Sequence, residues 1–385
     1  MTPVTDLVLL GGGHSHVAVL EQFGRRPVPG VRLTLISRGH YTPYSGMLPG
    51  FIAGHYTFED AHIDLRRLAR FAQARTVFDE AVGLDPSARV VMCRDTPAVP
   101  YGLLSIDIGS TPNVSVPGAA EHAIPVKPID HFLEQWQALR ERVRASAAVV
   151  RLAVVGGGAG GVELVLSAQF ALRTLLHRPG QSPERVECHL FTSSPAILPT
   201  HNHRARSTFD RIFRERGIHA HVGHKIIAVG AGRLRDDAGK VHAVDEILWT
   251  TEARAASWLR DSGLATDDDG FVRVSATLES TSHPGVFAAG DVASLVGHRL
   301  PKSGVYAVRE GETLAPNLRR ALAGETLRPY RPQRQVLSLI STGNKYAVAS
   351  RGPFAVSGPW VWHWKDAVDR AFMRKYNELP DERLA

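Results

Sequence analysis

The chain has 385 residues, 44% of them hydrophobic, and a formal net charge of +7, so it can bury a large core and its length favours two or three domains. Its two cysteines, Cys93 and Cys188, exclude a disulfide framework and a cysteine-rich metal site, and fit a reducing compartment. The basic residues are scattered and accompany no recognised nucleic-acid motif, so no nucleic-acid partner is expected. No signal peptide is recognised and no run approaches the ~20 apolar residues of a membrane span, which predicts a cytoplasmic protein.

The first element predicted is a strand at residues 7–10 that leads through a glycine-rich turn into a helix. Gly11 would allow the sharp turn, Gly13 would let backbone N–H groups approach a dinucleotide pyrophosphate, and the helix N-terminus would face its charge. His16 stands where G-x-G-x-x-G has its third glycine, so the motif alone is weak. A glycine-rich turn of any α/β protein remains the alternative.

The next strand, residues 31–36, ends at Ser37, where a dinucleotide site usually has an acid for the ribose hydroxyls. Residues 41–54 are dense in glycine, proline and aromatics, so this segment is either packed beneath something or lines a flat ligand. Short strands at 76–82 and 89–92, a strand at 103–108, a linker at 117–128 and a helix at 129–143 complete this part.

The opening pattern then returns, 145 residues further along the chain. A strand at 152–155 leads into a complete G-x-G-x-x-G at Gly156, Gly158 and Gly161, followed by a helix at 162–176. The next strand, 186–191, stops at Thr192, again without the ribose-binding acid. Two nucleotide sites are the natural interpretation. Residues 267–270, D-D-D-G, lack the spacing of a calcium loop and are interpreted as a turn, so no metal site is predicted.

The segment T-S-H-P-G-V-F-A-A-G-D at 281–291 is a strand ending in Gly290 and Asp291. Such a carboxylate can accept from the sugar-alcohol hydroxyls of a flavin dinucleotide. With the two glycine-rich turns, the chain resembles the pyridine nucleotide-disulfide reductase superfamily. Residues 249–291 are similar to type II NADH dehydrogenases, and P-K-S-G at 301–304 to sulfide:quinone reductases. G-G-G-H-S-H-V, Y-T-P-Y-S-G-M-L-P-G, L-P-K-S-G-V-Y-A-V-R-E-G and S-L-I-S-T-G-N-K-Y-A-V-A-S-R-G-P-F most resemble the flavoprotein module fused to, or encoded beside, selenide, water dikinase (selenophosphate synthetase).

This resemblance implies an α/β fold with two Rossmann-like, three-layer ββα domains and a small C-terminal α+β region. The FAD-binding domain would comprise residues 1–125 and 259–328, the inserted NAD(P)H-binding domain 126–258, and the C-terminal region 329–385. The implied FAD-binding residues are Gly11, Gly13, His14, Ser15, Ser37, Arg38, Gly109, Gly290, Asp291, Ser303 and Gly304, and the implied NAD(P)H-binding residues are Gly156, Gly158, Gly161 and Glu163. Lys302, Pro43 and Tyr44 are the implied catalytic residues; a solvent-exposed lysine is the alternative for Lys302.

The resemblance implies an FAD-dependent NAD(P)H oxidoreductase that reduces a quinone or another small acceptor. A redox disulfide is not expected, because Cys93 and Cys188 lie in different predicted domains. One alternative is a redox partner of selenophosphate synthetase acting on a selenium or sulfur species. Another is a non-enzymatic flavin or nucleotide sensor, since Thr192 and Glu252 depart from the family's nucleotide pattern.

The C-terminal segment 358–376 interleaves aromatic with basic residues. It would either lie on the inner face of a membrane and admit quinone, or cap the flavin and pack the C-terminal region.

Overall fold

The computed structural model describes residues 4–177, 181–251 and 253–380. Its first sheet contains five parallel strands in the order β21-β9-β1-β2-β5, centred on β1 (Thr5–Leu10). The others are β2 (Val31–Ser37), β5 (Arg75–Phe78), β9 (Leu103–Ile106) and β21 (Val286–Ala288). The central strands are nearly continuous apolar runs, as expected for a parallel sheet covered on both faces. Strand β21 joins from far along the chain, after the whole second sheet.

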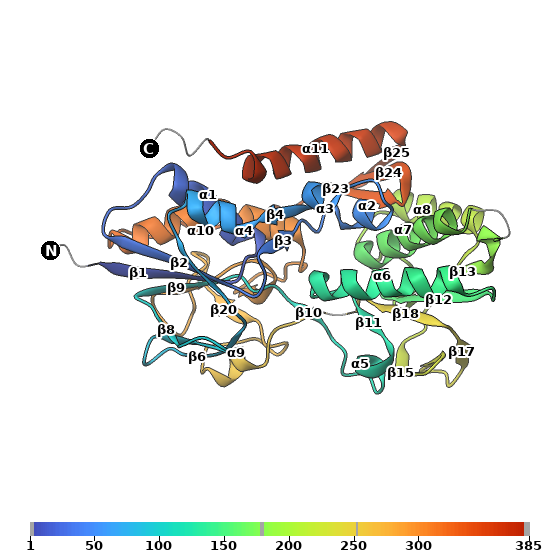
Figure 1. Ribbon diagram of the computed structural model, residues 1–385, viewed down its shortest axis with the longest axis horizontal. Coiled ribbons are helices and arrows are strands. Elements are labelled where there is room, and N and C mark those ends of the chain that lie inside the picture. The colour runs from blue at the N-terminus through green and yellow to red at the C-terminus, as the bar shows by residue number, and fades with distance from the viewer. Residues whose placement is uncertain (1–3, 178–180, 252, 381–385) are drawn as a thin grey trace.

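Helices α1 (His14–Arg25) and α10 (Gly304–Leu322) pack against each other on one side of this sheet, together with α4 (Leu65–Phe71) (Figure 1). The other side carries the antiparallel strands β6 (Ala81–Asp85), β7 (Val90–Cys93) and β8 (Val99–Pro100), the strand pair β20 (Val272–Val274) and β22 (Ala293–Leu295), and α9 (Trp258–Asp261).

The single strand expected at 76–82 is wrong, because the chain divides there between two sheets, β5 and β6. Asp79 produces the break. Its carboxylate accepts backbone N–H groups from Glu80, Asp95 and Thr96, at 2.7, 3.0 and 2.7 Å. A short polar side chain that bonds nearby backbone in this way favours a turn over a continuous ladder.

The second sheet is also parallel, in the order β11-β18-β12-β13-β14. Its strands are β11 (Ile124–Pro125), β12 (Val150–Val155), β13 (Val186–Thr192), β14 (Ile218–Val222) and β18 (Glu246–Trp249). Helices α6 (Ile129–Ala145), α7 (Ala159–Leu176) and α8 (His203–Arg216) cover one face, and an antiparallel sheet of β15 (Ile226–Gly230), β16 (Arg233–Asp236) and β17 (Val241–Ala243) covers the other (Figure 1). The α/β class with two Rossmann-like units is therefore confirmed. The supposed linker at 117–128 contains α5 (Ala119–His122) and the edge strand β11.

The C-terminal part is a three-stranded antiparallel sheet, β23 (Ser338–Thr342), β24 (Asn344–Arg351) and β25 (Phe354–Gly358), followed by α11 (Pro359–Asn377). Helix α11 runs along the outside of the molecule from the second unit back over the first (Figure 1). The glycine- and proline-rich segment lies beneath it: β3 (Tyr41–Pro43) pairs with β4 (His62–Asp64), and α2 (Leu48–Ile52) packs on α7. Short elements α3 (Phe58–Ala61), β10 (Thr111–Pro112), β19 (Ala253–Arg254), η1 (Pro183–Arg185) and η2 (Gly290–Val292) complete the described chain.

Helix α7 is, within the described residues, the one helix long and apolar enough to cross a membrane by length and composition alone. It follows the second glycine-rich turn and packs against β13 and β23, and more than half of it is buried inside the protein. Its apolar character is that of a core helix.

Candidate functional site

The first glycine-rich turn packs directly on the end of β9. Gly11 has φ +99°, and a Cβ there would lie 2.3 Å from the Asp107 carbonyl oxygen. A Cβ on Gly13 would lie 2.3 Å from the Asp107 carboxylate. Only glycine allows so close an approach of the two segments. The turn can therefore place the N-terminus of α1 at the edge of the sheet.

His16 replaces the third glycine of this turn and is fully buried between α1 and the sheet. Its Nδ1 lies 2.7 Å from the Gly11 carbonyl oxygen and its Nε2 2.8 Å from the Ser105 hydroxyl. A carbonyl can only accept, so Nδ1 carries the proton and Nε2 accepts from Ser105. Burial lowers the pKa of His16 to about 4, against the opposing bond to Gly11. The imidazole is therefore neutral and makes two hydrogen bonds at physiological pH.

Asp107 caps α1 from the side of the sheet. Its Oδ2 accepts the backbone N–H groups of Ser15 and His16, at 2.8 and 3.1 Å. Burial raises the pKa of Asp107 to about 7, although these two hydrogen bonds oppose the shift. A buried carboxyl that titrates near neutrality beside a glycine-rich turn is a candidate functional group. The sequence analysis missed it; its one signal was an acid at the end of an apolar strand.

Asp291 stands opposite this turn, after β21. It accepts from Lys127 Nζ at 2.6 Å and from the Ser110 hydroxyl at 2.9 Å. Burial alone would raise the pKa of Asp291, but the Lys127 ammonium and these hydrogen bonds bring it below its usual value. A carboxylate is therefore held ionised at the predicted position. Lys127 comes from the segment read as a linker, so no local motif pointed to it.

A cavity lies between the first turn, the end of β2, Asp291 and the start of α10. Of the residues predicted to bind FAD, it is lined by Gly11, Gly13, His14, Ser37, Arg38, Gly109, Asp291 and Gly304. His14 Nε2 is buried here and has no hydrogen-bond partner among the described residues. An unpartnered buried nitrogen beside a helix N-terminus fits a polar, phosphate-bearing ligand. The residues present thus fit the adenine dinucleotide that the sequence predicted.

Three residues predicted to bind this cofactor have other contacts in the structure. The Ser15 hydroxyl donates to the Ala307 carbonyl at 2.7 Å, which ties α1 to α10. Gly290 packs against Asp107, where a Cβ would lie 2.4 Å from its Oδ1. Ser303 is the N-cap residue of α10. None of the three lines this cavity, and their assignment to FAD stays a prediction.

The second glycine-rich turn has a similar form. Gly156 has φ +130°, and a Cβ on Gly161 would lie 1.9 Å from the Gly156 carbonyl oxygen. Gly158 and Gly160 face open space and line a second cavity, together with Gly161, Glu163 and Thr250. Glycine is thus required at two positions for packing, while the other two leave room for a ligand backbone.

Glu163 joins this second turn to the C-terminal sheet. Its Oε1 accepts the Ser341 backbone N–H at 2.7 Å. Burial raises the pKa of Glu163 to about 7, although the Lys365 charge opposes the shift. Thr192 packs against Gly157 on the other side of the turn and does not line the second cavity. Glu252 lies outside the described residues.

The three predicted catalytic residues occupy different places. Pro43 lines the first cavity. Lys302 lines the second, and its ammonium donates to the Ala293 carbonyl and lies 3.9 Å from the centre of the Phe271 ring. Tyr44 lines neither cavity: its ring stacks on Phe372 of α11 at 4.4 Å. Burial, with the charge of Asp369, raises the pKa of Tyr44, which keeps it protonated.

The two cavities meet. Their common lining residues are Ser45, Ser110, Thr111, Lys127 and Ile129. Lys127, which pairs with Asp291 in the first cavity, therefore also borders the second. The sequence predicted both ends of this arrangement. Of the residues that join them, it pointed only to Ser45, within the segment 41–54.

Both cysteines are free thiols. Cys188 is buried in β13, where burial raises its pKa to about 12, and the pKa of Cys93 in β7 is raised for the same reason. Thiols are nucleophilic as thiolates. Neither cysteine is therefore prepared for disulfide exchange in this structure.

The acidic run at 267–270 forms a tight turn in which Gly270 N donates to the Asp267 carbonyl at 3.0 Å, and Gly270 has φ +88°. The Asp267 carboxylate accepts the backbone N–H groups of Asp269 and Phe271. This aspartate therefore serves the turn itself.

Both glycine-rich turns and Asp291 lie in a region that matches a known protein family. A sequence profile of the pyridine nucleotide-disulphide oxidoreductase family matches residues 5–311. The chain is 25% identical over 351 residues to the NADH dehydrogenase-like protein YutJ of Bacillus subtilis, which covers 89% of this chain and 90% of that protein. It is 26% identical over 306 residues to the demethylphylloquinone reductase NdbB of Synechocystis, which covers 75% of this chain and 72% of that protein.

The fold is similar to that of a solved structure, the sulfide:quinone oxidoreductase of Aquifex aeolicus. The TM-score is 0.81 at 19% sequence identity, and the match covers 99% of this chain and 94% of that chain. At this identity the likeness establishes the fold alone.

Proposed function

The chain belongs to the pyridine nucleotide-disulphide oxidoreductase family, and on that premise we propose that it oxidises NAD(P)H through bound FAD and reduces a quinone without a redox disulfide. FAD and NAD(P)H are the cofactors typical of the family. When bound, the flavin would supply the exchange of electrons between the nucleotide and the acceptor.

The observation that carries the proposal is the junction of the two cavities. Each cavity begins at a glycine-rich turn, and both are lined by Ser110 and Lys127. Two dinucleotides held with their phosphates at these turns would direct their reactive rings toward this junction. Such an arrangement supports transfer from one cofactor to the other inside the protein.

Charged and polar groups of the protein surround this junction and would orient the bound cofactors. Lys127 and Ser110 hold Asp291 ionised at the wall of the first cavity. Gly304 at the N-terminus of α10 lines the same cavity, and a helix N-terminus carries roughly half a positive charge. The N-terminus of α10 would therefore stabilise negative charge on a ligand in the first cavity.

A quinone acceptor is supported by the character of one surface. Phe354 of β25 and Trp360 and Trp364 of α11 are 70%, 56% and 40% exposed. The indole rings of Trp360 and Trp364 stack at 6.5 Å. Exposed aromatic residues on a helix that carries basic residues suit a membrane surface. Trp362, Phe372 and Tyr376 pack inward on the same helix, which supports the packing role expected for this segment, while its exposed face supports membrane contact.

The first experiment is the visible absorption spectrum of the purified protein, followed by anaerobic addition of NADH and then NADPH. We expect bound flavin that bleaches with one of the nucleotides and recovers its colour when a soluble quinone is added. Bound flavin that neither nucleotide bleaches would contradict NAD(P)H oxidation. Absence of flavin after reconstitution would contradict the whole proposal.

The membrane contact is tested with the double variant Trp360→Ser/Trp364→Ser. We expect weaker binding to anionic liposomes and unchanged reduction of a soluble quinone, because these rings lie on the surface. Val241→Ser removes another exposed apolar side chain, on β17, and serves as the matched control. Equal binding by both variants and the wild type would exclude this surface.

Partnership with selenophosphate synthetase remains a prediction from sequence motifs. Co-purification with that enzyme would support it, and failure of NAD(P)H to bleach a bound flavin would instead favour the sensor alternative.

A further inference from the structure

A group of imidazole rings lies in the second unit, and none of them lines either of the two cavities. Five of the chain's 18 histidines belong to it. They come from three different strands and a loop: His189 from β13, His219 and His221 from β14, His224 from the loop after β14, and His242 from β17. Their rings stack or meet edge to face at centroid distances of 5.1 to 6.0 Å. No motif in the sequence singled out this group.

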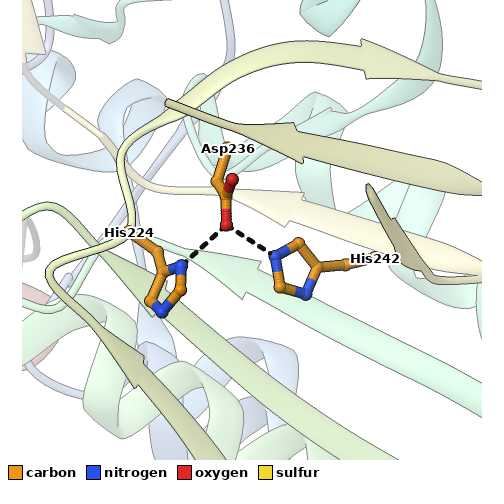
Figure 2. Close-up of side chains that lie close together, drawn as sticks. All are labelled: His224, Asp236 and His242. Carbon is orange, nitrogen blue, oxygen red and sulfur yellow. Dashed lines mark hydrogen bonds and ion pairs between the residues drawn. The ribbon is translucent and has the colours of Figure 1, made fainter. Parts of the chain in front are cut away.

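Three side chains of this region converge on one point. His224 Nδ1 lies 2.7 Å from Asp236 Oδ2, and His242 Nε2 lies 2.9 Å from the same oxygen (Figure 2). All three potential ligand atoms lie within 4.8 Å of one another. Asp236 is fully buried, so its carboxylate must be matched by positive charge or by hydrogen bonds.

The backbone fixes these side chains before any ligand binds. Asp236 ends β16 and His242 lies on β17, so one antiparallel hairpin carries both. His224 N donates to the Thr192 carbonyl at the end of β13, at 2.9 Å. The second oxygen of Asp236 accepts the Lys240 backbone N–H at 2.8 Å, which orients the carboxylate. Hydrogen bonds of this kind behind a ligand are typical of metal sites.

We propose that His224, Asp236 and His242 bind a divalent transition-metal ion of the zinc type. Two imidazoles and a carboxylate are ligands that zinc prefers, whereas calcium and magnesium prefer oxygen alone. Ligand atoms of a tetrahedral zinc ion are about 3.3 Å apart. The two distances to Asp236 Oδ2, 2.7 and 2.9 Å, therefore need to lengthen by only about half an ångström. The His224 side chain is 33% exposed, which leaves a solvent-facing position for water as a fourth ligand.

The ion would tie the β16–β17 hairpin to the loop after β14, where the backbone N–H of His224 donates to the Thr192 carbonyl at the end of β13. That strand end holds Thr192, beside the second glycine-rich turn. A metal ion bound only by the folded protein would stabilise the fold by mass action.

The test uses the full-length protein, treated with EDTA, dialysed and titrated with Zn²⁺ by calorimetry. We expect one strong site per chain, a higher melting temperature with Zn²⁺, and neither effect with Mg²⁺. His224→Gln is the principal variant, because its ring is partly exposed and the protein should fold without it. His224→Gln and Asp236→Asn should each weaken zinc binding at least tenfold.

His219→Gln is the matched control. His219 belongs to the same group of rings, where it stacks on His189, but it is not one of the three converging side chains. This variant should bind zinc like the wild type. Equal zinc affinity in the wild type and in His224→Gln would overturn the proposal and leave the three residues as a hydrogen-bonded cluster. An equal loss in His219→Gln would overturn it as well.

Discussion

The two glycine-rich turns solve the same packing problem with different residues. In the second turn, Gly161 approaches the Gly156 carbonyl so closely that a Cβ would lie 1.9 Å from its oxygen. In the first turn the equivalent position holds His16, whose Nδ1 donates to the equivalent carbonyl, that of Gly11, at 2.7 Å. One turn excludes every side chain at this carbonyl, and the other places a hydrogen-bonding ring there.

The comparison shows what the third position of such a turn must supply. A buried carbonyl has to be covered by backbone or paired with a donor. Glycine allows the first solution and histidine the second. The departure from G-x-G-x-x-G at His16 is therefore an alternative way to pack the turn, and by itself it does not count against a dinucleotide at this site.

The largest effect is expected from Gly161→Ala. The added methyl group would overlap the Gly156 carbonyl, so α7 has to move, at a cost of about 3 kcal/mol in the free energy of unfolding. Urea denaturation measures this loss. Gly160→Ala, one residue earlier, meets nothing within 4 Å and should change stability little. Equal stability of the two variants would contradict a role for the close approach, because alanine has the higher helix propensity at both positions of α7.

His16→Gly restores the family pattern and should nevertheless destabilise the protein. It leaves the buried Ser105 hydroxyl and the Gly11 carbonyl without their partner and opens a void, which costs about 2 kcal/mol. Thermal unfolding with and without added FAD measures the loss. A variant as stable as the wild type would contradict a stabilising role for His16, because glycine would then serve equally well at both turns.

The difference between the wild type and His16→Gly should depend on pH. Burial lowers the pKa of His16 from 6.5 to about 4, so between these values the unfolded chain binds the extra proton and the contribution of His16 falls as the pH falls. The difference should shrink by about 2 kcal/mol between pH 7 and pH 5. Asp107, whose pKa is raised to about 7, acts in the opposite direction but is present in both proteins. Denaturation midpoints at several pH values measure the trend; a constant difference would contradict it.

The sequence predicted the elements that depend on local pattern. Apolar runs and glycine spacing located both turns, the strands that carry them and Asp291, because these signals lie within a few residues of one another. It did not reveal Lys127 or Asp107, since their roles arise from contacts with Asp291 and with the first turn of α1, far along the chain. Such pairings depend on how the sheets are assembled.

Tyr44 is the reverse case, a residue that was predicted to be functional but lines neither cavity. The family resemblance implied a catalytic role for Tyr44, whereas in the structure its ring packs against Phe372 of α11. The composition of this segment predicts its apolar character, whereas the position of α11 decides which of its residues reach the cavity.

The smallest effect is expected at Lys127, the cation at the junction of the two cavities. Lys127→Met removes the charge that keeps Asp291 ionised, and the loss of a charge-assisted hydrogen bond should lower kcat/KM with NAD(P)H about tenfold. Lys302→Met is the matched control. Its ammonium donates to the Ala293 carbonyl and lies over Phe271, so kcat/KM should fall less in this variant than in Lys127→Met. A larger loss of kcat/KM in Lys302→Met than in Lys127→Met would favour Lys302, the lysine predicted from the sequence, as the catalytic cation. Lys127 would then only support Asp291.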